Sequence, residues 1–370
     1  MKAAALYIAI FALALLTIPM IAMNFDLPSA PEMQATVHSP VIPGKSDEIP
    51  PNNPETQSPE EPAEAAAEDP ETTLAAAVSD KGVESFLILD ETTGEVETVA
   101  LRDFVRGAVA AEMPANFHQE ALKAQAVAAH TFALHNHRVQ QETPEPELKG
   151  ADFSADPSNR KIYMTETQAR AFYGDKADQY WAKICAAADS VLPYVLEYDE
   201  EPIVAAYHAI SAGQTEDASN VWTGSAPYLA PVHSEGDILA PDYETDLSIS
   251  KEELETKLMD AYPEMVLQDD PDHWFGDTTR SGSGYVVEVE VGNQSLHGKE
   301  IRQLLDLRSH NFDVSYTDQG FVFTVYGYGH GVGLSQYGAD FLARQGKTFD
   351  EILSAYYTDA VLTQVEVAVE

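Results

Sequence analysis

The chain has 370 residues, 44% of them hydrophobic, and a formal net charge of −40 at pH 7. This length is enough for one large or two ordinary domains. So negative a protein repels phosphate backbones, which argues against a nucleic-acid partner. Cys185 is the single cysteine, so a disulfide within the chain and a metal site made of several cysteines are excluded.

The N-terminal segment is apolar from Ala3 to about Met23 and carries no charged residue over that length. A helix of this length can cross a bilayer. A cleaved secretory signal would have a shorter apolar core and a small-residue cleavage site, and it remains the alternative, together with a buried core helix. We expect residues 1–26 to be a single-pass anchor in the cell membrane. Lys2 then places the N-terminus in the cytosol and the rest of the chain outside.

Residues 27–77 are rich in proline, glutamate and serine and contain few aromatic residues. Such a segment cannot bury enough apolar surface to offset the entropy lost on ordering. We expect an acidic, disordered tether that holds the rest of the chain away from the membrane. The folded domain is predicted over residues 78–370.

The folded domain is predicted to begin with a hairpin and two helices. Apolar and polar residues alternate around Thr92-Thr93-Gly94, which is typical of a β-hairpin. Residues 101–113 have helical periodicity up to Pro114, which ends the helix because the residue before a proline avoids the α conformation. Asn116 is the expected N-cap of the second helix, with Gln119 as its capping-box partner. The predicted buried face of that helix consists of Phe117, Ala121, Ala124, Ala128 and Phe132.

Glu112 falls in the last turn of the first of these helices. A carboxylate there faces the negative end of the helix dipole, which disfavours its ionised form. Partial burial would raise its pKa further. A raised pKa suits a general acid, whereas the alternative is an exposed glutamate that merely ends a helix.

Residues 201–210 (EPIVAAYHAI) predict a buried strand, and a polar turn follows it. The hydroxyl groups and amides of this turn could bind sugar hydroxyls, and its aromatic neighbours Trp222 and Tyr228 are either stacking faces for sugar rings or core residues. Further on, GYGHGVG surrounds His330 with glycines, which suits a tight turn or a close approach to a ligand. Ser335 is expected to cap the helix that follows. The loop lacks the lysine and hydroxyl residue of a phosphate-binding loop and the Gly-x-Ser-x-Gly spacing of a nucleophile elbow.

Three blocks of the sequence resemble the stage II sporulation protein D family: EMPANFHQEALKAQAVAAHTFAL, AYHAISAGQTEDASNVWTGSAPYLAPV and GYGHGVGLSQYGA, in that order. This family is the membrane-anchored peptidoglycan lytic transglycosylase of endospore-forming bacteria, and the same domain occurs in proteins described as amidase enhancers. The resemblance places the catalytic acid at Glu112.

The resemblance implies cleavage of the MurNAc-GlcNAc backbone to 1,6-anhydro-MurNAc ends during the engulfment step of sporulation. One carboxyl group suffices, since the C6 hydroxyl of the substrate replaces the water that a hydrolytic glycosidase activates with a second carboxylate. The alternative is a non-catalytic module that binds glycan and stimulates an amidase. We assign substrate binding to residues of the second and third blocks: Tyr207, His208, Ser211, Gly213, Thr215, His330, Gly331, Ser335, Gln336 and Tyr337.

The resemblance also implies partners and a location. The expected partners are peptide-free glycan strands, an amidase that removes stem peptides and a multi-pass membrane protein that anchors the complex. The catalytic domain would lie outside the mother-cell membrane, in the intermembrane space.

Two positions depart from the family pattern. His130 stands where many relatives have an arginine, so any role of that arginine would be weaker or pH-dependent here. Some relatives carry a Cys/His zinc cluster shortly afterwards, but residues 148–164 contain neither cysteine nor histidine and have Ser154, Asn159 and Arg160 instead. We therefore expect no metal and no cofactor.

Ser250 with Glu253, and Thr348 with Glu351, are each expected to cap a further helix. Helical segments and antiparallel strands mix along the chain without the βαβ rhythm of a doubly wound sheet. These patterns predict an α+β catalytic domain with a smaller second lobe, which together form a groove for the glycan.

Overall fold

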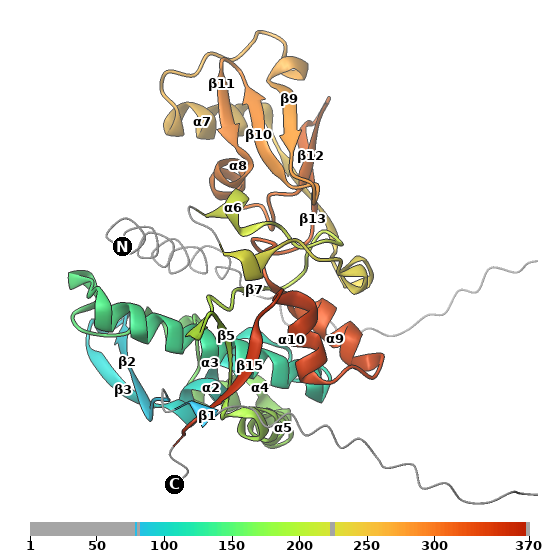
Figure 1. Cartoon of the computed structure of the whole chain (residues 1–370). Coiled ribbons are helices and arrows are strands. Elements are labelled where there is room, and N and C mark those ends of the chain that lie inside the picture. Colours follow the sequence, from blue (N-terminus) through green and yellow to red (C-terminus); the bar gives the residue numbers. More distant parts are fainter. Residues whose placement is uncertain (1–77, 80–81, 223–225, 368–370) are drawn as a thin grey trace, which may run out of the picture. The chain divides into compact units, whose positions relative to one another are not determined.

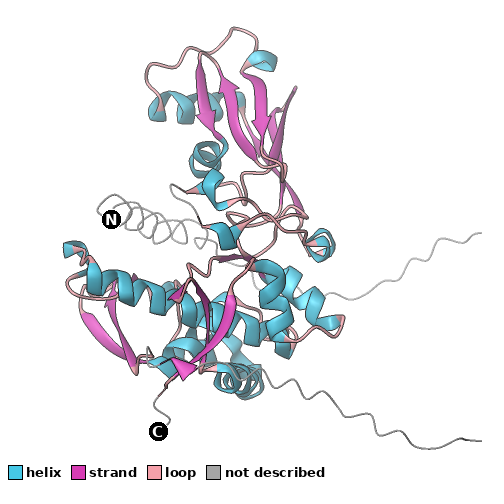
Figure 2. Ribbon diagram, viewed as in Figure 1, coloured by secondary structure: helices cyan, strands magenta, loops and turns pink. Residues whose placement is uncertain are grey.

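The structure is a computed structural model that describes residues 78–79, 82–222 and 226–367 (Figures 1 and 2). The predicted anchor at 1–26 and the predicted tether at 27–77 lie outside the described residues. No helix within the described ranges is both long enough and apolar enough to span a membrane. The helices and antiparallel sheets of these ranges confirm the predicted α+β class.

A first core is built around the hairpin and the two helices that the sequence predicts. Strands β2 and β3 pair antiparallel on either side of the Thr92-Thr93-Gly94 turn, and β4 joins β2 in parallel. Helix α2 ends at Glu112, with Met113 as its C-cap, as Pro114 predicts. The elements are β2 (Ser85–Asp90), β3 (Val96–Ala100), α2 (Leu101–Glu112), α3 (Gln119–Glu142) and β4 (Phe153–Ala155).

The N-cap of α3 differs from the prediction. His118, not Asn116, caps the helix: its Nδ1 accepts a hydrogen bond from the backbone N–H of Glu120 at 3.3 Å. The reason is a turn before the helix, in which the Phe117 N–H donates to the Pro114 carbonyl at 3.0 Å. This turn delays the start of α3 and leaves Asn116 exposed.

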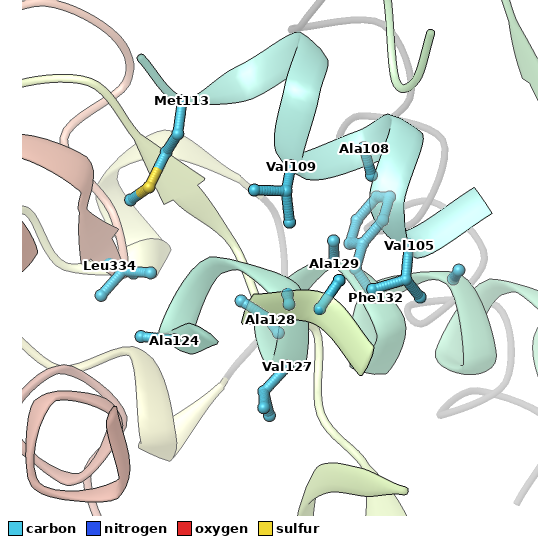
Figure 3. Packing of buried hydrophobic residues seen from close by; sticks show 14 of the residues in the cluster. Val105, Ala108, Val109, Met113, Ala124, Val127, Ala128, Ala129, Phe132 and Leu334 are labelled. Carbon is cyan, nitrogen blue, oxygen red and sulfur yellow. The ribbon is translucent and has the colours of Figure 1, made fainter. Parts of the chain in front are cut away.

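Small side chains line the contact between α2 and α3 (Figure 3). Ala124, Ala128 and Ala129 are buried, as is the predicted apolar face of α3 as a whole. Figure 3 shows Ala128 and Ala129 toward Val109 of α2 and Ala124 toward Leu334, in the same core that holds Met113 at the end of α2. Because alanine adds so little bulk, the end of α2 is held close to α3.

Further helices and a four-stranded sheet complete this first core. The strand order is β1-β15-β5-β6. The elements are β1 (Val78–Ser79), α4 (Glu166–Tyr173), α5 (Ala177–Val191), β5 (Tyr194–Tyr198), β6 (Glu201–Pro202), α9 (Gln336–Arg344), α10 (Phe349–Tyr356) and β15 (Val361–Val365). Ser335 caps α9 and the Thr348/Glu351 capping box begins α10, which confirms both predictions.

The predicted strand over residues 201–210 is mostly wrong. The structure gives only β6 and the two-residue β7 (Tyr207–His208), which pairs in parallel with β14 (Leu334–Ser335). Residues 203–206 between them are buried, as predicted, but irregular. Their apolar character reflects burial in the first core, which a coil segment can satisfy as well as a strand.

A second core confirms the predicted second lobe. It packs around Trp274, Phe321 and Phe323, between two three-stranded antiparallel sheets with the orders β11-β10-β9 and β12-β13-β8. Ser250 caps α7 as predicted. The elements are β8 (Glu244–Ile249), α7 (Lys251–Ala261), β9 (Phe275–Arg280), β10 (Val286–Val291), β11 (Gln294–His297), α8 (Gly298–Leu305), β12 (Phe312–Thr317) and β13 (Gly320–Tyr326).

Short segments connect these parts. The four-residue helix α6 (Ala218–Val221) follows the second sequence block. The 3-10 turns are η1 (Pro146–Leu148), η2 (Pro157–Asn159), η3 (Gly174–Lys176), η4 (Pro227–Leu229), η5 (Glu235–Leu239) and η6 (Pro271–His273).

The packing of α2 predicts an unusual response at Gly107. Alanine in place of a helix-interior glycine normally stabilises a helix by about 1 kcal/mol. Here a Cβ atom would lie 2.1 Å from the carbonyl oxygen of Met164. We expect Gly107→Ala to destabilise the protein by about 1–3 kcal/mol, because a backbone segment must shift. Chemical denaturation checks this.

The control for that measurement is Gly282→Ala, where a Cβ atom meets nothing within 4 Å. Its midpoint should stay close to that of the unmodified protein. Equal midpoints for the two variants would contradict the described packing of α2.

Candidate active site

Glu112 is the best-defined candidate for a catalytic group. Its side chain is enclosed by protein atoms while part of the residue stays accessible to solvent. Burial raises the pKa of its carboxyl group to about 7, against the opposing effects of a hydrogen bond from Gln336 and the positive charge of Arg160. Of the two causes of a raised pKa that the sequence suggested, the helix end and burial, burial is the main one. A carboxyl group with this pKa exchanges a proton readily near neutral pH.

All three sequence blocks contribute to the surroundings of Glu112. Gln336, at the start of α9, hydrogen-bonds the carboxylate and also donates from Nε2 to Gln125 Oε1 of α3 at 3.3 Å. Tyr207 in β7 lies near enough for the charge of Glu112 to help raise its phenol pKa, after the larger effect of burial. Tyr207 therefore keeps its proton and can donate a hydrogen bond. The structure brings Glu112, Tyr207 and Gln336 together.

A buried carboxylate, Asp237 of η5, connects the second and third blocks. Its Oδ2 accepts hydrogen bonds from the backbone N–H of Ser211 at 2.9 Å and from the Ser211 hydroxyl at 2.5 Å, and its Oδ1 accepts one from the Ser335 hydroxyl at 2.6 Å. Ser335 also caps α9 through the Gly338 N–H at 3.2 Å. Both serines are fully buried, so these bonds position the backbone. Their contact with substrate stays a prediction.

His208 and His330 lie side by side, with ring centroids 5.7 Å apart. Nδ1 of His208 donates to the Val332 carbonyl at 3.0 Å, and Nδ1 of His330 accepts from the Val332 N–H at 3.1 Å. Burial lowers the pKa of His208 to about 4 and that of His330 well below its usual range, so both rings are neutral at pH 7. The indole of Trp222 packs edge-on against the ring of His330, with centroids 4.9 Å apart. Trp222 is buried, which favours its interpretation as a core residue over that as a stacking face for a sugar.

The remaining predicted residues lie in the same two loops, except Tyr337, which lies in the first turn of α9. Thr215 is fully buried, and its hydroxyl accepts from the Val232 N–H at 2.8 Å. Gly213 and Gly331 have positive φ values of 91° and 81°, and a Cβ on Gly331 would lie 2.4 Å from the Tyr285 hydroxyl oxygen. Tyr337 packs edge-on against Phe117, with centroids 4.9 Å apart. Their roles in substrate binding stay predictions.

Glu216 joins the second block to the second lobe. It is buried, its Oε2 accepts from the Ser281 hydroxyl, and its backbone N–H donates to the Gly331 carbonyl at 2.8 Å. Its other oxygen accepts from the Asp217 N–H at 2.6 Å. Asp217 caps α6 through the Ser219 N–H at 2.8 Å. These hydrogen bonds tie both acids to the scaffold.

Comparison with known proteins agrees with the three blocks. The family model described as "Stage II sporulation protein" matches residues 90–198. The chain is 32% identical over 312 residues to stage II sporulation protein D of Bacillus subtilis (strain 168), covering 82% of this chain and 88% of the relative. It is 34% identical over 272 residues to the protein of the same name from Bacillus amyloliquefaciens, covering 73% and 76%. The chain belongs to the stage II sporulation protein D family.

A more distant relative is the amidase enhancer of Bacillus subtilis (strain 168). The identity is 25% over 318 residues, which cover 70% of this chain and 40% of the relative. The name of this relative matches the alternative function that the sequence leaves open.

At two places this chain departs from the stage II sporulation protein D pattern. The residue that replaces the family arginine is uncharged, and the residues at the place of the zinc ligands form hydrogen bonds. Burial lowers the pKa of His130 to about 4, so it carries no charge at pH 7. Ser154 Oγ donates to Glu91 at 2.7 Å, and Asn159 Nδ2 donates to Asp156 at 2.6 Å. The loop is thus held by hydrogen bonds.

Two residues of the site lie beyond what the sequence alone predicted. Asp237 stands in a loop, PVHSEGDIL, whose pattern reads as an ordinary acidic turn. Arg160 was noted only for not being a metal ligand, yet its charge acts on Glu112. Neither residue has a local signal, because each acts across a long sequence separation.

The pKa of Glu112 can be measured directly. The carboxyl carbon signal of Glu112, assigned by its loss in Glu112→Gln, should titrate with a midpoint of about 7. In Gln336→Ala the midpoint should move to higher pH, because the amide no longer stabilises the ionised form. The control is Gln345→Ala at the exposed end of the same helix, which should leave the midpoint unchanged. A midpoint near 4.5, the ordinary value, would contradict the burial described here.

Proposed function

We propose that this protein is a peptidoglycan lytic transglycosylase that cleaves the MurNAc-GlcNAc backbone to 1,6-anhydro-MurNAc ends, with Glu112 as its acid and base. The observation that carries the proposal is the raised pKa, about 7, of a carboxyl group that belongs to a partly accessible residue. Such a group is protonated often enough to act as an acid and ionised easily enough to act as a base.

The chemistry needs one carboxyl group in two steps. Protonated Glu112 gives its proton to the glycosidic oxygen as the bond from that oxygen to C1 of the muramic acid breaks. The C6 hydroxyl of the same sugar then bonds to C1, and the Glu112 carboxylate takes the hydroxyl proton. The acid is regenerated and no water is consumed, so the second carboxylate of a hydrolytic glycosidase is not required.

The surroundings of Glu112 suit this sequence of steps. Among the described residues, the groups that shift its pKa are Gln336 and Arg160, and no carboxylate is among them. Gln336 favours the ionised form that must exist between the two steps. Tyr207 keeps its phenol proton and can donate a hydrogen bond to the substrate or the carboxylate.

The family supports a role in sporulation, and we propose the finer assignments along with it. The chain would act during engulfment, anchored in the mother-cell membrane by residues 1–26 with its N-terminus in the cytosol and its catalytic domain in the intermembrane space. An amidase would supply peptide-free strands, and a multi-pass membrane protein would hold the complex. The alternative, a non-catalytic glycan-binding enhancer of an amidase, is favoured by the similarity to the amidase enhancer.

Mass spectrometry of peptide-free glycan strands after incubation with the protein tests the activity. We expect anhydro-muramic ends from the unmodified chain and a loss of about a hundredfold to ten-thousandfold in rate for Glu112→Gln, because the amide cannot deliver a proton. The matched control, Asp103→Asn, removes an exposed acid from the same helix and should keep full activity.

Two other outcomes would contradict the proposal. Reducing ends would mean hydrolysis and a second carboxylate. Intact strands that still bind both proteins would support the amidase-enhancer alternative.

The pH dependence follows from the direction of the shift. Glu112 carries the proton that it donates below its pKa of about 7 and loses it above. We therefore expect kcat/KM to be level on the acidic side and to fall about tenfold for each pH unit above about pH 8. A rate that rises through pH 7 would mean that Glu112 starts the reaction ionised.

A further inference from the structure

A cation and an exposed aromatic ring lie together outside the three sequence blocks. Phe172, in α4, is 51% exposed. The guanidinium carbon of Arg160, the residue after η2, lies 4.5 Å from the centroid of that ring. Stacking of this kind orients the guanidinium plane and leaves its edge of N–H donors free to bind.

This pair is linked to the catalytic helix. The ring of Phe172 lies 5.4 Å from that of Tyr173, whose hydroxyl donates to the carbonyl of Ala110 at 3.3 Å. Ala110 lies in the same last turn of α2 as Glu112. Burial raises the pKa of both Glu112 and Tyr173, and the positive charge of Arg160 opposes that rise in each, so Arg160 lies within electrostatic reach of both.

Arg160 lacks an acidic partner where one would be expected. The chain has 61 acidic residues and 21 lysines and arginines. The next residue, Lys161, is paired with Glu91, and the nearby Arg170 is paired with Glu166 at 2.5 Å and Asp178 at 2.7 Å. Within the described ranges no carboxylate comes within 4.0 Å of Arg160 to form such a pair. A planar guanidinium of this kind suits a carboxylate from a ligand.

We propose that Arg160 and Phe172 form a subsite for muramic acid, in which Arg160 binds the free lactyl carboxylate and Phe172 covers the apolar face of the sugar ring. This subsite rests on the proposed function. The other groups of a peptide-free strand, its hydroxyls and acetamido groups, are neutral, so the lactyl carboxylate is the anionic group that a guanidinium can select. A stem peptide converts that carboxylate into a neutral amide, and the subsite then loses its charged partner.

Binding at this subsite would also affect the acid. Arg160 favours the ionised form of Glu112 in the free protein. A carboxylate bound to Arg160 offsets that charge, so Glu112 holds its proton more firmly once a strand is in place. The subsite therefore selects the strand and prepares the acid for the first step.

The test compares two ligands in a binding measurement. Peptide-free strands and the same strands with methylamidated lactyl groups are titrated into the full-length chain carrying Glu112→Gln, so that no cleavage occurs. We expect the methylamidated strands to bind about tenfold to a hundredfold more weakly, as expected for the loss of a hydrogen bond to a charged group. Adding Arg160→Gln should weaken binding of the peptide-free strands by a similar factor and leave binding of the methylamidated strands nearly unchanged.

The control variant is Arg170→Gln, which removes an exposed and paired cation from α4. It should bind both ligands like the parent. Phe172→Ala should weaken the binding of both ligands by the same factor, since the contact of the ring with the sugar does not depend on the lactyl charge. The carboxyl carbon signal of Glu112 in the otherwise unmodified chain should titrate at higher pH in Arg160→Gln and at the original pH in Arg170→Gln.

Two results would overturn the subsite. One is equal binding of the two ligands by the parent, a comparison that needs no variant to fold. The other is an equal loss for both ligands in Arg160→Gln, which would mean a structural role. Because binding is measured without cleavage, a failure of the transglycosylase proposal would appear separately, as the absence of anhydro ends.

Discussion

The arrangement around Glu112 depends on the buried carboxylate of Asp237. By accepting hydrogen bonds from Ser211 and Ser335, it fixes the second block against the third and holds Ser335 as the cap of α9. The next residue is Gln336, whose amide reaches Glu112. A charged group without these partners would be costly at such a depth, so the network is favourable only when every bond forms together. Asp237 thus helps to position Glu112 through Ser335 and Gln336, without any need to contact the substrate itself.

The environment of Glu112 meets two opposing requirements, burial and access to the substrate. The carboxyl group must be buried enough to keep its proton near neutral pH, yet open enough to meet a polymer. Buried alanines let the end of α2 pack closely against α3, and α2 ends at Glu112, two residues before Pro114. Gln336 and Arg160 then limit the shift, so the group can still ionise.

Local patterns in the sequence predicted the parts of the fold that local interactions decide. The hairpin at Thr92-Thr93-Gly94, the end of α2 and the caps at Ser250, Ser335 and Thr348 each depend on a few consecutive residues. The predictions were wrong or incomplete where contacts between residues far apart in the sequence determine the structure. Residues 203–206 are apolar because a core surrounds them, and Asp237 and Arg160 act on partners far along the chain. The prediction of the N-cap of α3 was wrong for a local reason. The sequence of residues 114–119 did not reveal the turn that begins at Pro114.

The central claim is that one carboxyl group cleaves the glycan without water. The most direct test is the reaction of peptide-free strands in water enriched in heavy oxygen, with mass analysis of the new ends. The account predicts anhydro-muramic ends that carry no label, because the C6 hydroxyl of the sugar supplies the attacking oxygen. Label on the anomeric carbon of the new ends would show that water attacks, and it would contradict the account.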